Sequence, residues 1–254
     1  MHRILALIVI LGTTACDPAP GESDAGTDAG LQDASNGNLC DPVTAPCEDE
    51  MIQQLSLHTT VATGEVTSSE ASGVFTAVID ASAGGSQGST NYPFVYVKFT
   101  DSGAIKVAID DETALASQDW DIAVRRYILR LNGGDSGPSC VAAAETSAQF
   151  DAVTTAPGES AFALEDFYTA SCDYVTDTRF AGFDGPDTLL KEFWSMNGMC
   201  LATSGITYVL RLADGRHLKL VVDAYYRTGQ DGCNTSGTAG SQSGVLTLRW
   251  AWLS

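Results

Sequence analysis

The chain has 254 residues, a formal net charge of −19 and an isoelectric point of about 4.2. This acidity argues against nucleic acid as a partner, because phosphates require a basic binding face. Hydrophobic residues make up 44% of the sequence, and roughly 200 residues follow Met51, enough for one sizeable core.

The N-terminus predicts a bacterial lipoprotein signal peptide. Met1–Arg3 is basic, Ile4–Leu11 is an uninterrupted apolar run, and small residues precede Cys16. The apolar run is shorter than the roughly 20 residues that a membrane span needs. We expect residues 1–15 to be removed and Cys16 to carry the lipid, which places the protein at the outer membrane or cell surface. Ordinary cleavage near Ala15, which releases a soluble protein, is the alternative.

Residues 16–50 predict a flexible acidic tether. From Asp17 to Glu50 there are nine Asp or Glu and no Lys or Arg, with few large apolar side chains. Such a segment cannot bury enough apolar surface to offset the entropy lost on ordering. Near its end, Cys40 and Cys47 predict a small disulfide loop at the edge of the domain.

The cysteines are typical of an exported chain. With lipid on Cys16, six of the seven remain, an even number that favours disulfides. Six cysteines allow 15 pairings. Proximity in sequence favours Cys40–Cys47, Cys140–Cys172 and Cys200–Cys233. A zinc site is disfavoured because the C-x-x-C spacing is missing.

Residues 51–254 predict one mainly antiparallel β domain with a few short helices. Apolar and polar residues alternate with the period of a strand over 73–81, 92–100, 104–110, 119–131, 205–212, 217–226 and 245–252. Asp101-Ser102-Gly103 predicts a hairpin turn. Short helices are expected over residues 160–168 and 187–194.

The segment from Asp119 to Leu131 is apolar on both parities, so we expect it to be a strand in the middle of the packed sheets. Trp120 should then be buried. Asp119 and Asp121 should point elsewhere, where they are available to Arg125 or Arg126.

The same segment carries a recognisable pattern. DWDIAVRRYILRLNGGDSG, residues 119–137, resembles the signature D-W-D-I-A-x-x-R-Y-x-x-R-x-N-G-G-x-S-G of the HmuY-like haem-binding lipoproteins. Further along, Tyr208–Leu220, the pair Tyr225-Tyr226 and Gly244–Trp250 resemble later strands of that family. The resemblance implies a HmuY-like β domain that binds haem or porphyrin for haem capture, with haem or a haem-carrying protein as partner and no catalytic chemistry.

The resemblance also implies two axial haem ligands, His or Met, in a pocket walled by loops. The candidates are His58, Met196 and Met199, although none matches a ligand position of the family's motifs. The two methionines precede the strand at Gly205; the alternative is that they are apolar loop residues. His217 shares the parity of Lys219 and is expected to face solvent.

Three arginines, Arg125, Arg126 and Arg130, could pair haem propionates if they reach a pocket; otherwise they should be solvated or paired with Asp119 and Asp121. A HmuY-like surface module without haem, with an interaction or structural role, is the alternative function.

Two further motifs are weak. Gly134-Asp135-Ser136-Gly137-Pro138 is similar to the nucleophile loop of trypsin-like proteases but lacks one Gly, and His58 has none of that family's context. The acidic clusters at residues 110–112 and 184–187 could hold calcium, but neither has an EF-hand register, and solvated surface acids are the simpler interpretation.

Overall fold

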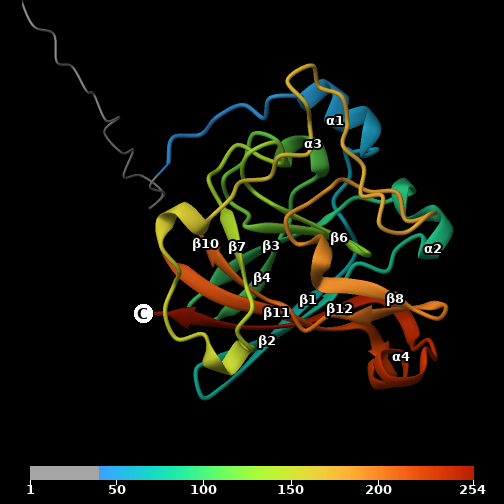
Figure 1. Ribbon diagram of the computed structural model, residues 1–254. Coiled ribbons are helices and arrows are strands. Elements are labelled where there is room, and N and C mark those ends of the chain that lie inside the picture. Colours follow the sequence, from blue (N-terminus) through green and yellow to red (C-terminus); the bar gives the residue numbers. More distant parts are fainter. Residues whose placement is uncertain (1–39) are drawn as a thin grey trace, which may run out of the picture. The chain divides into compact units, whose positions relative to one another are not determined.

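The structure is a computed structural model that describes residues 40–254 (Figure 1). The expected signal peptide, the lipidation site Cys16 and the tether up to residue 39 lie outside the described residues. Among those described, no helix has the length and apolar character that crossing a membrane requires.

The largest sheet has six antiparallel strands in the order β1-β2-β12-β11-β10-β7. Their bounds are Val66–Ala71, Val74–Asp80, Ser241–Leu253, His217–Thr228, Thr207–Arg211 and Ala142–Thr146, in that order. In β2 the alternation read from the sequence gives one core face, where Phe75, Ala77 and Ile79 are buried while their neighbours are half-exposed.

A second sheet has four antiparallel strands in the order β4-β3-β5-β6, and a third consists of the hairpin β8-β9. Their bounds are Gly103–Val107, Val95–Thr100, Ile122–Arg125, Ile128–Leu131, Trp194–Asn197 and Cys200–Thr203, in that order. The helices are α1 (Glu48–Gln54), α2 (Gly85–Gly88), α3 (Asp111–Ala114) and α4 (Gln230–Ser236), with 3-10 turns at Ser89–Asn91, Phe150–Ala152, Glu159–Ala161 and Lys191–Phe193.

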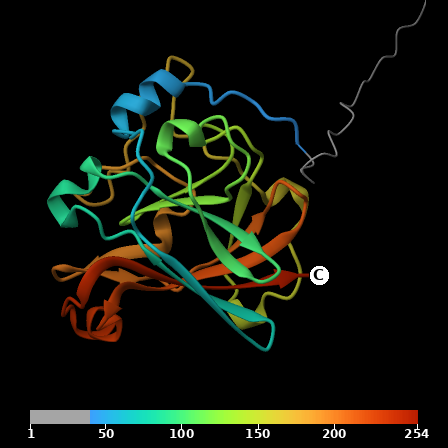
Figure 2. The same ribbon diagram turned by 180° about the vertical axis from the view of Figure 1, so that it is seen from behind.

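In the four-stranded sheet, β5 and β6 are buried on both faces. Ile122 and Val124 of β5 face the main core, which also contains Leu248 and Trp250 of β12. Ala123 faces a second cluster, formed with α1 and α3. Figure 1 shows α1 and α3 on one side of β3 and β6, with β2 and β12 on the other, and the reverse view in Figure 2 agrees. The expected mainly antiparallel β fold is therefore confirmed.

The segment from Asp119 to Leu131 is a hairpin and not the single strand expected. Strands β5 and β6 pair antiparallel, with Ile122 opposite Leu131 and Arg125 opposite Ile128. The turn passes through Arg126, whose φ is 54°. A non-glycine residue seldom adopts this left-handed conformation, and no Asn-Gly or Asp-Gly pair marks the turn in the sequence.

Neither expected helix forms as predicted. Within 160–168, only the end of the 3-10 turn Glu159–Ala161 is helical, and Ala163 then exchanges backbone hydrogen bonds with Ala143 of β7, at 2.9 and 3.0 Å. Within 187–194, a 3-10 turn leads directly into β8, where Trp194 pairs with Thr203. In both segments, backbone pairing with another segment outweighs the local helical pattern.

Residues 40–50, expected as the end of a flexible tether, are packed on the domain. Ala45 and Cys47 are buried, Val43 N donates to Pro138 O at 2.9 Å, and α1 begins at Glu48.

The disulfides explain this packing. Cys40 is bonded to Cys140 and Cys47 to Cys172, across 100 and 125 residues of chain. The expected Cys40–Cys47 and Cys140–Cys172 pairings are therefore wrong, because residues 40–47 lie against distant segments and do not close on themselves. Cys200–Cys233 forms as expected and joins β9 to α4.

Candidate functional site

A cavity of about 440 Å³ opens beside the β8-β9 hairpin, and we call it the Met199 cavity. Its walls come from the β5-β6 turn, the loop before β8, the end of β11 and the start of β12, so it collects segments far apart in the chain. It is lined by Arg126, Tyr127, Gly182, Phe183, Met199, Leu201, Tyr225, Tyr226, Ala239, Gly240, Gln242 and Ser243.

Aromatic rings form much of this wall. Tyr127 packs edge-on against Phe183, with 5.2 Å between ring centroids, and both rings contact Trp194 behind them. Tyr225 and Tyr226 meet at 5.1 Å, and burial raises the pKa of Tyr225 to about 12, so its hydroxyl is neutral at physiological pH. Such a surface suits a ligand with a flat aromatic face.

Arg126 supplies the positive charge of the cavity. The residue is 3% exposed, and its guanidinium donates to the carbonyl oxygen and Oγ of Ser243, at 3.2 and 2.9 Å. Its Nε has no hydrogen-bond partner among the described residues. The left-handed turn at Arg126 therefore directs this side chain away from the β5-β6 ladder and toward β12.

The two candidate methionines have separate environments. Met199 lies at the β8-β9 turn beside Gly198, lines the cavity, and is 92% exposed. Met196 lies on β8 opposite Leu201, is half-buried, and packs against the main core. The structure thus brings only Met199 to the cavity.

His58 and His217 lie outside the Met199 cavity. The ring Nε2 of His58 is 2.8 Å from Thr90 O, and its backbone N–H donates to Asp111. His217 was expected to face solvent, but it is half-buried beside the Phe162 ring, because the Glu159–Phe162 segment covers this part of β11.

Arg125 and Arg130, the other two candidate arginines, are neither solvated nor paired with Asp119 or Asp121. Arg125 donates to backbone carbonyl oxygens, and Arg130 donates to Met51 Sδ and Tyr96 Oη, at 3.2 and 3.3 Å. Asp121 is buried under β3 and accepts from Phe99 N at 2.7 Å, and this burial raises its pKa to about 7.

The acidic cluster at residues 110–112 is not a set of solvated surface acids. Asp111 is fully buried and accepts hydrogen bonds from His58 N, Phe94 N and Tyr96 Oη. Asp110 caps α3 through Thr113 N. The carboxylates of Asp110 and Asp111 thus hold the chain, whereas Glu112 is exposed. In the other cluster, Asp187 pairs with Lys191. Residues 40–254 contain no group of three or more His, Cys, Asp or Glu arranged to hold a metal.

The Gly134–Pro138 loop has a structural role. Asp135 accepts from Tyr168 N at 2.7 Å, and Ser136 is fully buried with its Oγ unpartnered among the described residues. A serine nucleophile requires a hydrogen-bonded base, and none contacts this hydroxyl.

The family model of the HmuY protein matches residues 90–237, more than half of the chain. The chain belongs to the HmuY family. The matched region of this HmuY family member includes eight of the residues that line the Met199 cavity, from Arg126 to Tyr226. No curated protein matches the chain.

Several solved structures resemble this HmuY family member. A Bacteroides vulgatus protein assigned as HmuY-like and haem-binding is 19% identical, with a TM-score of 0.46 over 74% of this chain and 96% of that one. An apo HmuY analogue from Tannerella forsythia is 16% identical, with a TM-score of 0.41 over 76% and 98%. A Bacteroides fragilis protein assigned as a lipoprotein is 18% identical, with a TM-score of 0.40 over 72% and 91%.

Sequence reasoning named Met199 and Arg126 as candidates but did not place them together. It assigned Phe183, Gly240 and Gln242 to no site, because the first two lie outside the strands and Gln242 lies at the start of β12, ahead of the alternation at 245–252. Tyr225 and Tyr226 entered only through the family resemblance. Only the folded structure brings these residues together, because it places five separate segments of the chain around one cavity.

Proposed function

We propose that this chain is an exported, lipid-anchored binding protein, not an enzyme, that captures haem or a related porphyrin in the Met199 cavity. The single observation that carries the proposal is the combination at that cavity of aromatic walls, a buried arginine and an exposed thioether, in a chain of the HmuY family.

Each feature matches one part of the ligand. A methionine thioether is an axial ligand for haem iron, and Met199, at 92% exposed, is free to provide one. The rings of Tyr127, Phe183 and Tyr225 suit the flat porphyrin. Arg126 offers a charged partner to a propionate, which the acidic surface otherwise repels.

A haemin titration followed by absorbance tests the proposal. We expect a Soret shift that saturates at equimolar haemin in the wild type and is lost or strongly weakened in Met199→Leu, which keeps the volume and removes the sulfur. Met196→Leu is the matched control, because Met196 packs against the core; His58→Ala is the second. Both should bind as the wild type does. A wild-type spectrum that does not change would refute haem capture.

The second candidate is a surface interaction module of the same family that does not bind haem. It is favoured by the position of His58 and His217 outside the cavity, which leaves a lone thioether as ligand. Under this alternative, Met199 and the aromatic wall would contact a protein partner, and haemin would leave the spectrum unchanged.

A further inference from the structure

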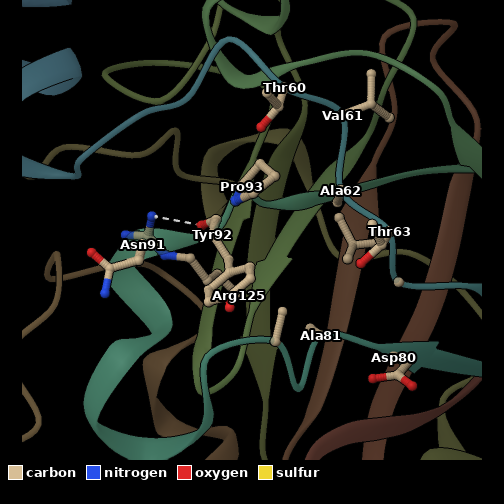
Figure 3. Close-up of a pocket in the computed structure, with 13 residues that line it drawn as sticks. Thr60, Val61, Ala62, Thr63, Asp80, Ala81, Asn91, Tyr92, Pro93 and Arg125 are labelled. Carbon is tan, nitrogen blue, oxygen red and sulfur yellow. Dashed lines mark hydrogen bonds between the residues drawn. The ribbon is translucent and has the colours of Figure 1, made fainter.

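A second cavity, of about 310 Å³, lies on the other side of the β5-β6 turn, and we call it the Arg125 cavity. Figure 3 shows Tyr92 and Arg125 on one side of it and the segment Val61–Thr63 on the opposite side, with Ala81 below. It shares no lining residue with the Met199 cavity. It is lined by Thr60, Val61, Ala62, Thr63, Gly64, Asp80, Ala81, Ala83, Asn91, Tyr92, Pro93, Val95 and Arg125.

Arg125 lies in this wall with its charge uncompensated. The residue is 3% exposed, and its guanidinium donates to Leu55 O at 2.6 Å and, more weakly, to Ser56 O and Tyr92 O. Its Nε has no partner, and no carboxylate among residues 40–254 forms an ion pair with it. A buried charge bonded only to neutral carbonyl groups is costly. Consistently, burial lowers the pKa of Arg125 to about 10.

A second buried arginine, Arg130, lies close to Arg125. Arg125 and Arg130 both lie over the Phe94 ring, at 4.2 and 4.3 Å from its centroid. Both arginines interact with the carboxylate of Asp111. Its oxygens accept hydrogen bonds from three other donors, and burial raises its pKa. Arg130 also interacts with the buried Glu165, whereas Arg125 is the one of the two that lines the Arg125 cavity.

The one carboxylate in the cavity wall does not offset this charge. Asp80 accepts from Ser82 N and Oγ and pairs with Arg227 at 3.2 Å. Its charge is therefore matched outside the cavity, and the net field within it remains that of Arg125.

The rest of the wall is small and largely apolar. Ala62, Ala81, Ala83 and Val95 line it, and Val61 and Tyr92, each 44% exposed, are among its lining residues that reach solvent. The volume lies at the lower end of the range for small-molecule sites. An apolar wall with one buried cation suits a ligand with a short hydrocarbon body and one anionic group.

We propose that the Arg125 cavity binds a small organic carboxylate, with its anionic group toward Arg125 and its hydrocarbon part toward Val61 and Tyr92. The site is independent of the proposed haem function. Its wall from Thr60 to Ala83 also precedes residues 90–237, the part of the chain that the family model matches.

Calorimetric titration of the whole mature protein with butanoate, hexanoate and octanoate tests this proposal, with the alcohols of equal chain length as uncharged controls. We expect the carboxylates to saturate one site and to bind at least about tenfold more tightly than the matching alcohols, because a charge-assisted hydrogen bond replaces a neutral one. Equal affinity of acids and alcohols, or no binding of either, would overturn it.

Two variants locate the site. Val61→Trp should fill the cavity and weaken carboxylate binding at least about tenfold, whereas Val43→Trp, an equal change at an exposed residue outside the cavity, should leave the affinity within about twofold. Arg125→Gln should remove the preference for acids over alcohols. If that variant does not fold, the Val61→Trp comparison still decides.

Haemin separates this site from the proposed haem function. Protein saturated with haemin should bind the carboxylates unchanged, and protein that fails to bind haemin should bind them equally well. Competition between haemin and octanoate would show that the two ligands share one site, which would contradict the proposal.

Discussion

Replacing Trp120 by Ala should be among the most destabilising single changes in the β domain. Trp120 is fully buried in the cluster between the four-stranded sheet, α1 and α3. Its ring packs edge-on against Tyr96 at 5.0 Å, and its Nε1 donates to Ala114 O at 3.0 Å. A Cβ on Gly137 would approach the ring to 2.9 Å, so the backbone there lies directly against the indole.

The magnitude follows from these contacts. Truncating a fully buried Trp to Ala costs about 3–5 kcal/mol, because apolar burial is lost and a cavity remains. We expect the upper part of that range, since the edge-on pair with Tyr96 adds roughly 0.5–1.5 kcal/mol. Loss of the Nε1–H donor should add little, because Ala114 O also accepts from Ser117 N.

Urea unfolding under oxidising conditions, followed by circular dichroism, measures this loss. Trp252→Ala is the matched control, because Trp252 is half-buried and its Nε1 has no hydrogen-bond partner among the described residues; about 1 kcal/mol is expected. A Trp120→Ala midpoint close to that of the wild type at unchanged slope would refute the reasoning. It would mean that the second cluster does not stabilise the fold.

Three further predictions concern the anchor, the disulfides and pH. Labelled palmitate should mark the wild-type protein in cells but not Cys16→Ser, and equal labelling would exclude lipidation at Cys16. Alkylation of the denatured mature protein should find no free thiol by mass spectrometry, and two or more alkylated cysteines would contradict the three disulfides. Burial raises the pKa of Glu165 and Asp121 to about 7 each, so the folded state takes up protons as pH falls toward 5. The free energy of unfolding should therefore decrease as pH rises through about 7. In Glu165→Gln, the total fall in the free energy of unfolding with rising pH should be smaller by about 3 kcal/mol. An unchanged dependence on pH would show that Glu165 is not the group that titrates.

The sequence predicted the strands well wherever one face is buried. The alternation in 73–81 and 217–226 became β2 and β11. In β2, burial of every second residue enforces the period of two, whereas β11 also buries adjacent residues and shifts register after Val222. It also predicted that Trp120 is buried, since a segment apolar on both parities belongs between layers.

Irregular segments could not be predicted in this way. The chain from Gly158 to Phe193 is held by isolated bridges and by side chains such as Glu165, which accepts from Leu131 N and Leu189 N at 3.0 and 2.9 Å. The two hydrogen bonds of Glu165 join residues 34 and 24 positions apart and leave no local pattern. The same holds for Cys40–Cys140 and Cys47–Cys172, which proximity in sequence could not suggest.

The β5-β6 turn decides how the two candidate sites are placed. In a continuous strand, Arg125 and Arg126 would point to opposite faces of one sheet. The left-handed conformation of Arg126 ends the strand instead, and its guanidinium reaches Ser243 of β12, at the Met199 cavity. Arg125, the last residue of β5, keeps its place on the Phe94 side and borders the Arg125 cavity. Two adjacent arginines thus line two separate cavities, in a protein whose net negative charge would otherwise repel anions from both.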